Sequence, residues 1–217
     1  MCYPRFYRIA ATRYALHLAA MRSQGLAVPH VVAIGASAGG ISALTTLLAA
    51  LPANLPAPLL IVQHLAPDFV SHLPDLLASK TGYDVISAVD GTVLENGRAY
   101  VAPADRHLTV DETGHIRLLA TVRVRFARPS VDVLFCSAAQ VFGERVIAIV
   151  LTGTGSDGTE GAHVVRDHGG IVIAQSEASS EYYGMPGSVL KHGYADYALP
   201  LAVISQRIIE WTAVPHG

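Results

Sequence analysis

The chain has 217 residues, of which 51% are hydrophobic and only 15% are charged, and its formal net charge is −2. This length suffices for one domain with a full core, and the scarcity of charge predicts an α/β fold whose sheet is covered by helices on both faces. The net charge gives no general attraction to nucleic acid or to an anionic membrane. Two cysteines, Cys2 and Cys136, are too few for a disulfide framework, which fits a cytoplasmic protein.

A membrane span has to be considered because no charged residue occurs from Val31 to Gln63. Glycines and prolines, however, divide this stretch into pieces shorter than the ~20 residues that a bilayer core requires. These interruptions are Gly35, Gly39, Gly40, Pro52, Pro56 and Pro58. We therefore expect no transmembrane helix.

Residues 1–29 contain four arginines and no acidic residue. Targeting segments share this composition, but the stretch lacks a long apolar core and a clear small-residue cleavage site. We expect an N-terminal extension over residues 1–29, followed by a single domain over residues 30–213.

The first motif is a run of apolar residues from Val31 that ends in a Gly-x-Ser-x-Gly-Gly turn and continues into a helix from Ile41. This pattern predicts a buried strand, a tight turn and a helix, with Ser37 at the apex. The turn suits a nucleophile beside an oxyanion site. It also suits a phosphate-binding loop, or a purely structural turn.

Two further polar residues follow predicted strands. His64 ends the strand that begins at Pro58, and Asp157 lies in a second Gly-rich turn, after the strand 145–151. Because the carboxyl ends of neighbouring parallel strands share one edge of a sheet, we expect Ser37, His64 and Asp157 to converge. A serine hydroxyl needs a base, and the base needs a carboxylate to orient it, so the three residue types predict a catalytic triad.

The remaining predicted elements complete a doubly wound, mostly parallel sheet with a small antiparallel hairpin extension. The middle of the chain predicts an antiparallel group of short strands, at residues 84–88, 98–102, 107–110 and 115–119. Two more strands are expected at residues 171–175 and 195–198. Helices are expected at residues 67–79, 129–142, 158–168 and 200–211, with a short helix after the loop at Gly184–Gly187.

Two other functional classes compete with the triad. The turn containing Gly153, Gly155 and Gly158 fits the G-x-G-x-x-G pattern of dinucleotide sites, and Glu177 follows near the offset of a ribose ligand. Against this, the charge of Asp157 would face the pyrophosphate. The second class is a non-catalytic adaptor. Taken singly, His64 could be a structural histidine and Asp157 the N-cap of the helix that follows it.

A metal site has no support from spacing. None of the ten histidines is followed by another four positions later, and neither cysteine has a nearby partner. We therefore expect neither a metal nor a cofactor.

Six motifs, in order along residues 31–200, resemble the catalytic domain of the chemotaxis protein-glutamate methylesterases. They are Ile34–Gly40, Gln63–His64, Tyr100–Pro103, Arg128–Phe135, Leu151–Gly158 and Gly184–Pro186. This coverage is far more specific than a single Gly-rich turn.

The resemblance implies a serine esterase that hydrolyses γ-glutamyl methyl esters on chemoreceptors and releases methanol; some members of the family also deamidate receptor glutamines. It implies Ser37 as nucleophile, His64 as general base and Asp157 as orienting carboxylate. The backbone N–H groups of Ala38 and Thr154 match the oxyanion donors of the family.

The matching motifs also place Arg128 and Met185 among the expected substrate-binding residues. Arg123, Arg125 and Arg128 cluster in an otherwise charge-poor chain and could dock acidic receptor helices. The implied partner is a methylated chemoreceptor or receptor-like protein, with membrane contact only through that receptor. Two departures bear on the substrate, because Thr154 replaces a frequent methionine and Gly187 replaces a common basic residue.

Members of the family usually carry an N-terminal receiver domain. The segment before the first strand of this chain is too short to form one. We therefore expect no control by an attached receiver domain, and a separate receiver protein is the alternative regulator.

Overall fold

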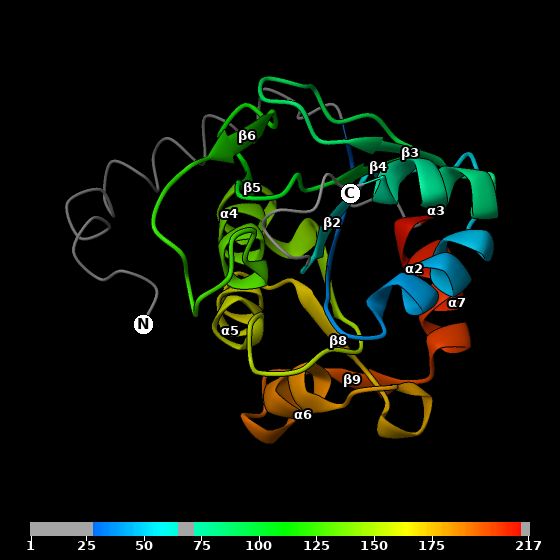
Figure 1. Cartoon of the computed structure of the whole chain (residues 1–217), viewed down its shortest axis with the longest axis vertical. Coiled ribbons are helices and arrows are strands. Elements are labelled where there is room, and N and C mark those ends of the chain that lie inside the picture. The colour runs from blue at the N-terminus through cyan, green and yellow to red at the C-terminus, as the bar shows by residue number, and fades with distance from the viewer. Residues whose placement is uncertain (1–27, 65–71, 214–217) are drawn as a thin grey trace.

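The computed structural model describes residues 28–64 and 72–213 (Figure 1). Its centre is a parallel seven-stranded sheet in the order β3-β4-β2-β1-β7-β8-β9. The strands are β1 (Val31–Ala36), β2 (Leu59–Gln63), β3 (Asp84–Ser87), β4 (Arg98–Val101), β7 (Val146–Val150), β8 (Ile171–Gln175) and β9 (Tyr197–Leu199). The predicted doubly wound α/β fold is confirmed. The N-terminal extension expected over residues 1–29 lies almost wholly outside the described residues.

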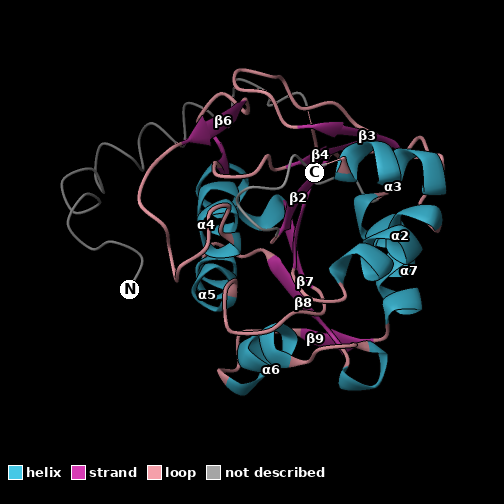
Figure 2. Ribbon diagram, in the orientation of Figure 1, coloured by secondary structure: helices cyan, strands magenta, loops and turns pink. Residues whose placement is uncertain are grey.

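Helices cover both faces of this sheet (Figure 2). One face carries α2 (Gly40–Ala49), α3 (Leu73–Thr81) and α7 (Leu201–Thr212). The other carries α4 (Val131–Phe142), α5 (Thr159–Asp167), α6 (Gly184–Lys191) and an antiparallel hairpin of β5 (His107–Val110) and β6 (Ile116–Leu119). Short 3₁₀ turns lie at Gly143–Arg145 and Glu177–Ser179.

Strand β1 lies at the middle of the sheet and is buried along its whole length. Val31 and Ala33 pack into the core under α4, whereas Val32 and Ile34 pack into the core under α2. Because both faces of β1 are covered, its sequence is a continuous apolar run rather than an alternating one.

Strands β2, β4 and β3 lie in that order on one side of β1, and β7, β8 and β9, which follow later in the chain, lie on the other side. The switch point therefore lies between β1 and β7. In open α/β sheets, ligands bind outside the carboxyl ends of the strands at such a point. Ser37 follows β1, and the turn with Gly153 follows β7.

The structure corrects several details of the sequence prediction. Strands β3 and β4 pair in parallel and belong to the main sheet, so only β5 and β6 form the antiparallel part. The predicted loop at Gly184 is the first turn of α6. Helix α3 begins at Leu73, and the earlier start predicted at Pro67 lies outside the described residues.

No helix among residues 28–64 and 72–213 combines the length and apolarity needed to cross a bilayer.

Gly35 allows the start of α4 to approach β1 closely. A Cβ atom at Gly35 would lie 2.3 Å from the Val131 side chain. We predict that Gly35→Ala lowers the free energy of unfolding by about 1–3 kcal/mol, as overpacking does in a close-packed core. Chemical denaturation measures this loss.

Val131→Ala supplies the matched background for this test. The cost of Gly35→Ala should be smaller when Val131 is also alanine, because the double variant removes the overlapping atoms. Equal costs in the two backgrounds would contradict the assigned contact.

Candidate active site

Ser37 occupies the turn between β1 and α2 and is partly exposed. Its backbone N–H donates to the carbonyl of Thr152 (3.0 Å), and its carbonyl accepts from the N–H of Gly40 (2.9 Å). The left-handed conformation of this turn falls on Gly39, with φ of 75°. The glycine therefore makes the sharp turn, and Ser37 keeps an ordinary backbone conformation.

Gln63, the last residue of β2, links the turn after β1 to the residue that follows β2. Its side-chain Nε2 donates to the carbonyls of Ser37 (2.8 Å) and His64 (3.0 Å). Its Oε1 lies so close to Gly40 that a Cβ atom there would be 2.0 Å away. The amide thus fixes the positions of Ser37 and His64 relative to each other, and it requires glycine at the start of α2.

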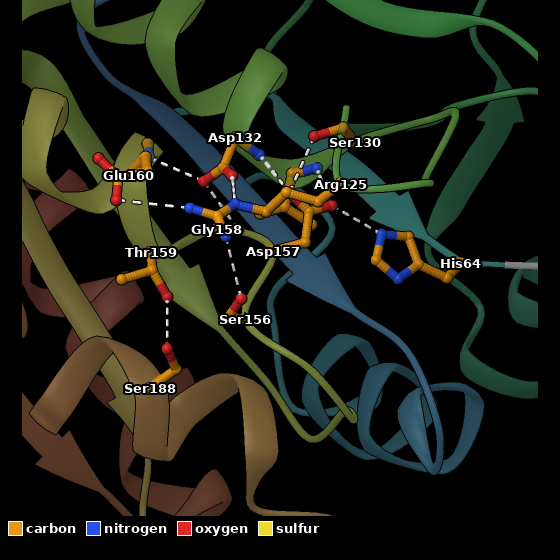
Figure 3. Close-up of polar contacts among 12 residues, drawn as sticks. His64, Arg125, Ser130, Asp132, Ser156, Asp157, Gly158, Thr159, Glu160 and Ser188 are labelled. Atoms are coloured by element: carbon orange, nitrogen blue, oxygen red, sulfur yellow. Dashed lines mark hydrogen bonds and ion pairs between the residues drawn. The ribbon is translucent and has the colours of Figure 1, made fainter. Parts of the chain in front are cut away.

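His64 and Asp157 form a direct hydrogen bond between Nε2 and Oδ2 at 2.8 Å (Figure 3). The Asp157 side chain is 5% exposed and that of His64 is 22% exposed. An ionised carboxylate only accepts hydrogen bonds, so Nε2 carries the proton. In this tautomer Nδ1 is the ring nitrogen that can accept a proton.

Asp157 also caps the N-terminus of α4. Its Oδ1 accepts from the Ser130 hydroxyl (2.8 Å) and the Asp132 N–H (3.0 Å), and its Oδ2 accepts from the Val131 N–H (2.8 Å). Burial opposes the ionisation of Asp157, but the hydrogen bonds from His64, Asp132 and Val131 outweigh it and hold its pKa below the ordinary value. The carboxylate is therefore ionised at neutral pH. It caps α4 and not the helix that follows it in sequence.

Asp132 makes the reciprocal contact from α4 to the start of α5. Its Oδ1 accepts from the N–H groups of Gly158 (2.9 Å) and Gly161 (2.8 Å). Burial and the nearby charge of Asp157 raise the pKa of Asp132 to about 6. Arg125 offsets this repulsion through an ion pair of 3.1 Å with Oδ2 of Asp132. Asp132 was not predicted as a site residue from the sequence, although a carboxylate in the first turn of an apolar helix was a usable signal.

His107, in β5, supports the same region and was also missed. Its Nδ1 accepts from the N–H of Ser130 (3.2 Å), and its Nε2 donates to the carbonyl of Val122 (3.1 Å). Burial lowers the pKa of His107, which keeps the ring neutral and able to accept from Ser130.

The reciprocal capping contradicts the dinucleotide alternative. The N-terminus of α5, where a pyrophosphate would bind, already donates its Gly158 and Gly161 N–H groups to Asp132. The Asp157 side chain turns to His64 and α4. The turn of Gly153, Gly155 and Gly158 thus presents no open anion site at α5.

Ser37, His64 and Asp157 line one cavity of about 550 Å³. The other lining residues are Arg123, Arg125, Phe126, Ala127, Arg128, Pro129, Thr154, Gly155 and Ser156. The expected convergence of the three strand ends on one site is therefore observed.

The two predicted oxyanion donors lie on the turns beside Ser37. Thr154 lines the cavity, and within the described part of the chain neither its N–H nor that of Ala38 donates to another group. Gly153 brings the second turn close, because a Cβ there would lie 2.8 Å from Cβ of Ser37. Thr154 thus lies on the cavity wall with Ser37, whereas Ala38 is next to Ser37 in sequence but is not among the residues that line the cavity.

The two expected substrate-binding residues have different positions. Arg128 lines the cavity, and its guanidinium binds Oδ1 of Asp105 and the carbonyl of Thr121. Met185 is fully buried, and its Sδ would lie 2.4 Å from a Cβ at Gly153. Met185 therefore packs behind the Gly153 turn, so its position is that of a supporting residue and not of a substrate contact.

Within residues 28–64 and 72–213, no three His, Cys, Asp or Glu side chains are grouped as a metal site would require.

Comparison with known proteins places this architecture in a family. The family model described as CheB methylesterase matches residues 32–208. The crystal structure of the Thermotoga maritima CheB methylesterase catalytic domain superposes with a TM-score of 0.81 at 39% identity, over 84% of this chain and 98% of that one. The chain belongs to the CheB methylesterase family.

Curated relatives carry the same family name in longer proteins. A protein-glutamate methylesterase/protein-glutamine glutaminase of Saccharophagus degradans is 42% identical over 82% of this chain and 49% of its own length. One of Methanosarcina mazei is 40% identical over 84% of this chain and 52% of its own length. One of Anaeromyxobacter dehalogenans is 40% identical over 96% of this chain and 62% of its own length. The chain thus spans about half to three fifths of these relatives.

The hydrogen bonds to Asp157 predict a specific dependence of stability on pH. A carboxylate whose pKa is lower in the folded state stabilises the fold above its unfolded pKa of about 4, and this contribution is lost as the pH falls through the folded value. The stability difference between the native chain and Asp157→Asn should therefore be largest near pH 7 and shrink below about pH 4. Denaturation across this range measures it.

Asp75→Asn is the matched control, because the Asp75 side chain is 89% exposed. Its effect on stability should be small throughout. A difference for Asp157→Asn that grows as the pH falls would contradict the assigned hydrogen bonds.

Proposed function

We propose that this chain is a serine esterase that hydrolyses γ-glutamyl methyl esters on a chemoreceptor protein and releases methanol. The observation that carries the proposal is the 2.8 Å bond from His64 Nε2 to the buried Asp157 carboxylate, in the cavity that Ser37 also lines. Membership of the CheB methylesterase family supports the choice of ester and substrate.

In the proposed first step, Nδ1 of His64 takes the proton of the Ser37 hydroxyl as Oγ attacks the ester carbonyl carbon. Asp157 stabilises the imidazolium without taking its proton. The C–OCH₃ bond then breaks, and His64 returns the proton to the departing methoxide, so methanol leaves and an acyl-enzyme remains. Water then attacks the acyl carbon while His64 takes its proton, and His64 returns that proton to Oγ of Ser37 as the acyl C–O bond breaks and the glutamate side chain leaves.

The N–H groups of Ala38 and Thr154 are proposed to hold the negative oxygen of each tetrahedral intermediate. Such donors are worth roughly 3–4 kcal/mol of transition-state stabilisation each. Because backbone groups do this work, threonine at position 154 serves as well as another side chain. Glutamine deamidation uses the same steps with ammonia as the leaving group, and we propose it as a second activity.

We further propose residues 30–213 as the catalytic unit, with residues 1–29 outside it. The match of the family model to residues 32–208 supports the boundaries of the unit.

Removal of the Ser37 hydroxyl tests the reaction. Ser37→Ala should reduce methanol release from methylated receptor by at least about 10⁴-fold, because the variant has no nucleophile to acylate. Thermal unfolding should be unchanged. Ser42→Ala, on the exposed face of α2, is the control and should retain activity. Near-native turnover by Ser37→Ala would refute the mechanism.

Arg123 is the arginine best suited to dock an acidic receptor. Arg125 pairs with Asp132 and Glu160, and Arg128 pairs with Asp105, whereas Arg123 has no ion pair within the described part of the chain. All three arginines line the cavity, but we propose that only Arg123 docks the receptor, because the other two are held in ion pairs within the chain.

Arg123→Ala should raise KM for methylated receptor several-fold at low salt with little change in kcat, and the effect should fade as salt screens the attraction. Steady-state kinetics at two ionic strengths measure it. Arg106→Ala is the control, since Arg106 is exposed but does not line the cavity. An effect that is equal at both ionic strengths would contradict docking by charge.

A further inference from the structure

The segment between β6 and α4 exposes two large apolar side chains, and one of them, Phe126, lines the cavity. Phe126 is 96% exposed and Val122 is 64% exposed, the two highest values among the large hydrophobic residues that the structure describes. Phe126 lines the cavity together with Ser37 and His64. A large aromatic ring left in water at a cavity offers apolar area that a bound ligand can cover.

Phe126 occupies a turn position whose backbone conformation is unfavourable for phenylalanine. Val124 and Ala127 exchange two backbone hydrogen bonds (2.8 and 3.1 Å), which closes a two-residue turn. Arg125 and Phe126, its central residues, have φ of 48° and 66°. Turns of this kind favour Asn-Gly, because both positions are left-handed. The fold thus holds a bulky ring where a small residue would be easier to accommodate.

Arg125 anchors this turn to the active site. Its guanidinium binds Asp132 (3.1 Å), Ser156 (3.3 Å) and Glu160 (3.4 Å), which belong to α4, the loop before α5, and α5 (Figure 3). Asp132 in turn binds the N–H of Gly158, next to Asp157. The backbone of the turn that carries Phe126 is therefore tied to the residues around Asp157, while the ring itself stays exposed.

We infer that Phe126 is a specificity-determining contact for an apolar side chain of the substrate polypeptide, next to the glutamyl ester. The inference rests on the proposed esterase function. A glutamyl side chain has only two methylenes between Cα and its carboxyl carbon, so the substrate backbone must lie at the cavity rim when the ester reaches Ser37. Residues flanking the ester then face Phe126, and covering its ring removes apolar surface from water.

Phe126→Asn tests the inference without disturbing the turn, because asparagine tolerates positive φ. Its thermal stability should equal or exceed that of the native chain. We expect kcat/KM for methylated receptor to fall at least tenfold, mainly through KM. Hydrolysis of p-nitrophenyl acetate, which has no flanking residues, should change less than twofold. Phe126→Tyr should retain activity on the receptor.

Val89→Asn is the matched control, since Val89 is 59% exposed but does not line the cavity. It should leave both activities unchanged. Native kcat/KM on receptor in Phe126→Asn, or an equal loss on both substrates, overturns the role of Phe126 while leaving the esterase intact. If the native chain itself releases no methanol from methylated receptor, the proposed function fails, and the inference fails with it.

Discussion

The structure of the site depends on two carboxylates, Asp157 and Asp132, each of which caps the N-terminus of the helix beside the other. Asp157, just before α5, accepts the first N–H groups of α4, and Asp132, in the first turn of α4, accepts the first N–H groups of α5. Each carboxylate therefore lies at the positive end of the partner helix, where a negative charge is favoured. This exchange locks α4 to α5 and leaves one oxygen of Asp157 in contact with both Val131 and His64.

Two glycines allow the turns around Ser37 to pack closely against their neighbours. Gly40 admits the Gln63 amide that ties Ser37 to His64, and Gly153 brings the second turn against Ser37. In a densely packed interior, one added methyl group at either glycine would push these turns apart. The polar groups that face the cavity thus depend on glycines that themselves carry no reactive group. Placement of His64 depends on the N-terminus of α4 as much as on its own strand.

Much of this could be predicted from the sequence, because buried parallel strands produce continuous apolar runs and β1 and β8 are such runs. The convergence of Ser37, His64 and Asp157 could be predicted because the parallel strands that they follow, β1, β2 and β7, share one carboxyl edge. The antiparallel prediction for β3 and β4 was wrong: β3 is a half-exposed edge strand without the continuous apolar run of a buried parallel strand, and its connection to β4 is short for a parallel pair. The partner helix of Asp157 and the burial of Met185 depend on tertiary packing, which no local pattern encodes.

The proposed mechanism requires that Asp157 and His64 make Ser37 reactive. Labelling with a serine-directed phosphonate, followed by mass spectrometry of the peptides, measures this reactivity. We expect one adduct, on the peptide that contains Ser37, and a loss of labelling in His64→Gln while the fold is retained. Labelling of another serine, or labelling of Ser37 at an unchanged rate in His64→Gln, would contradict it.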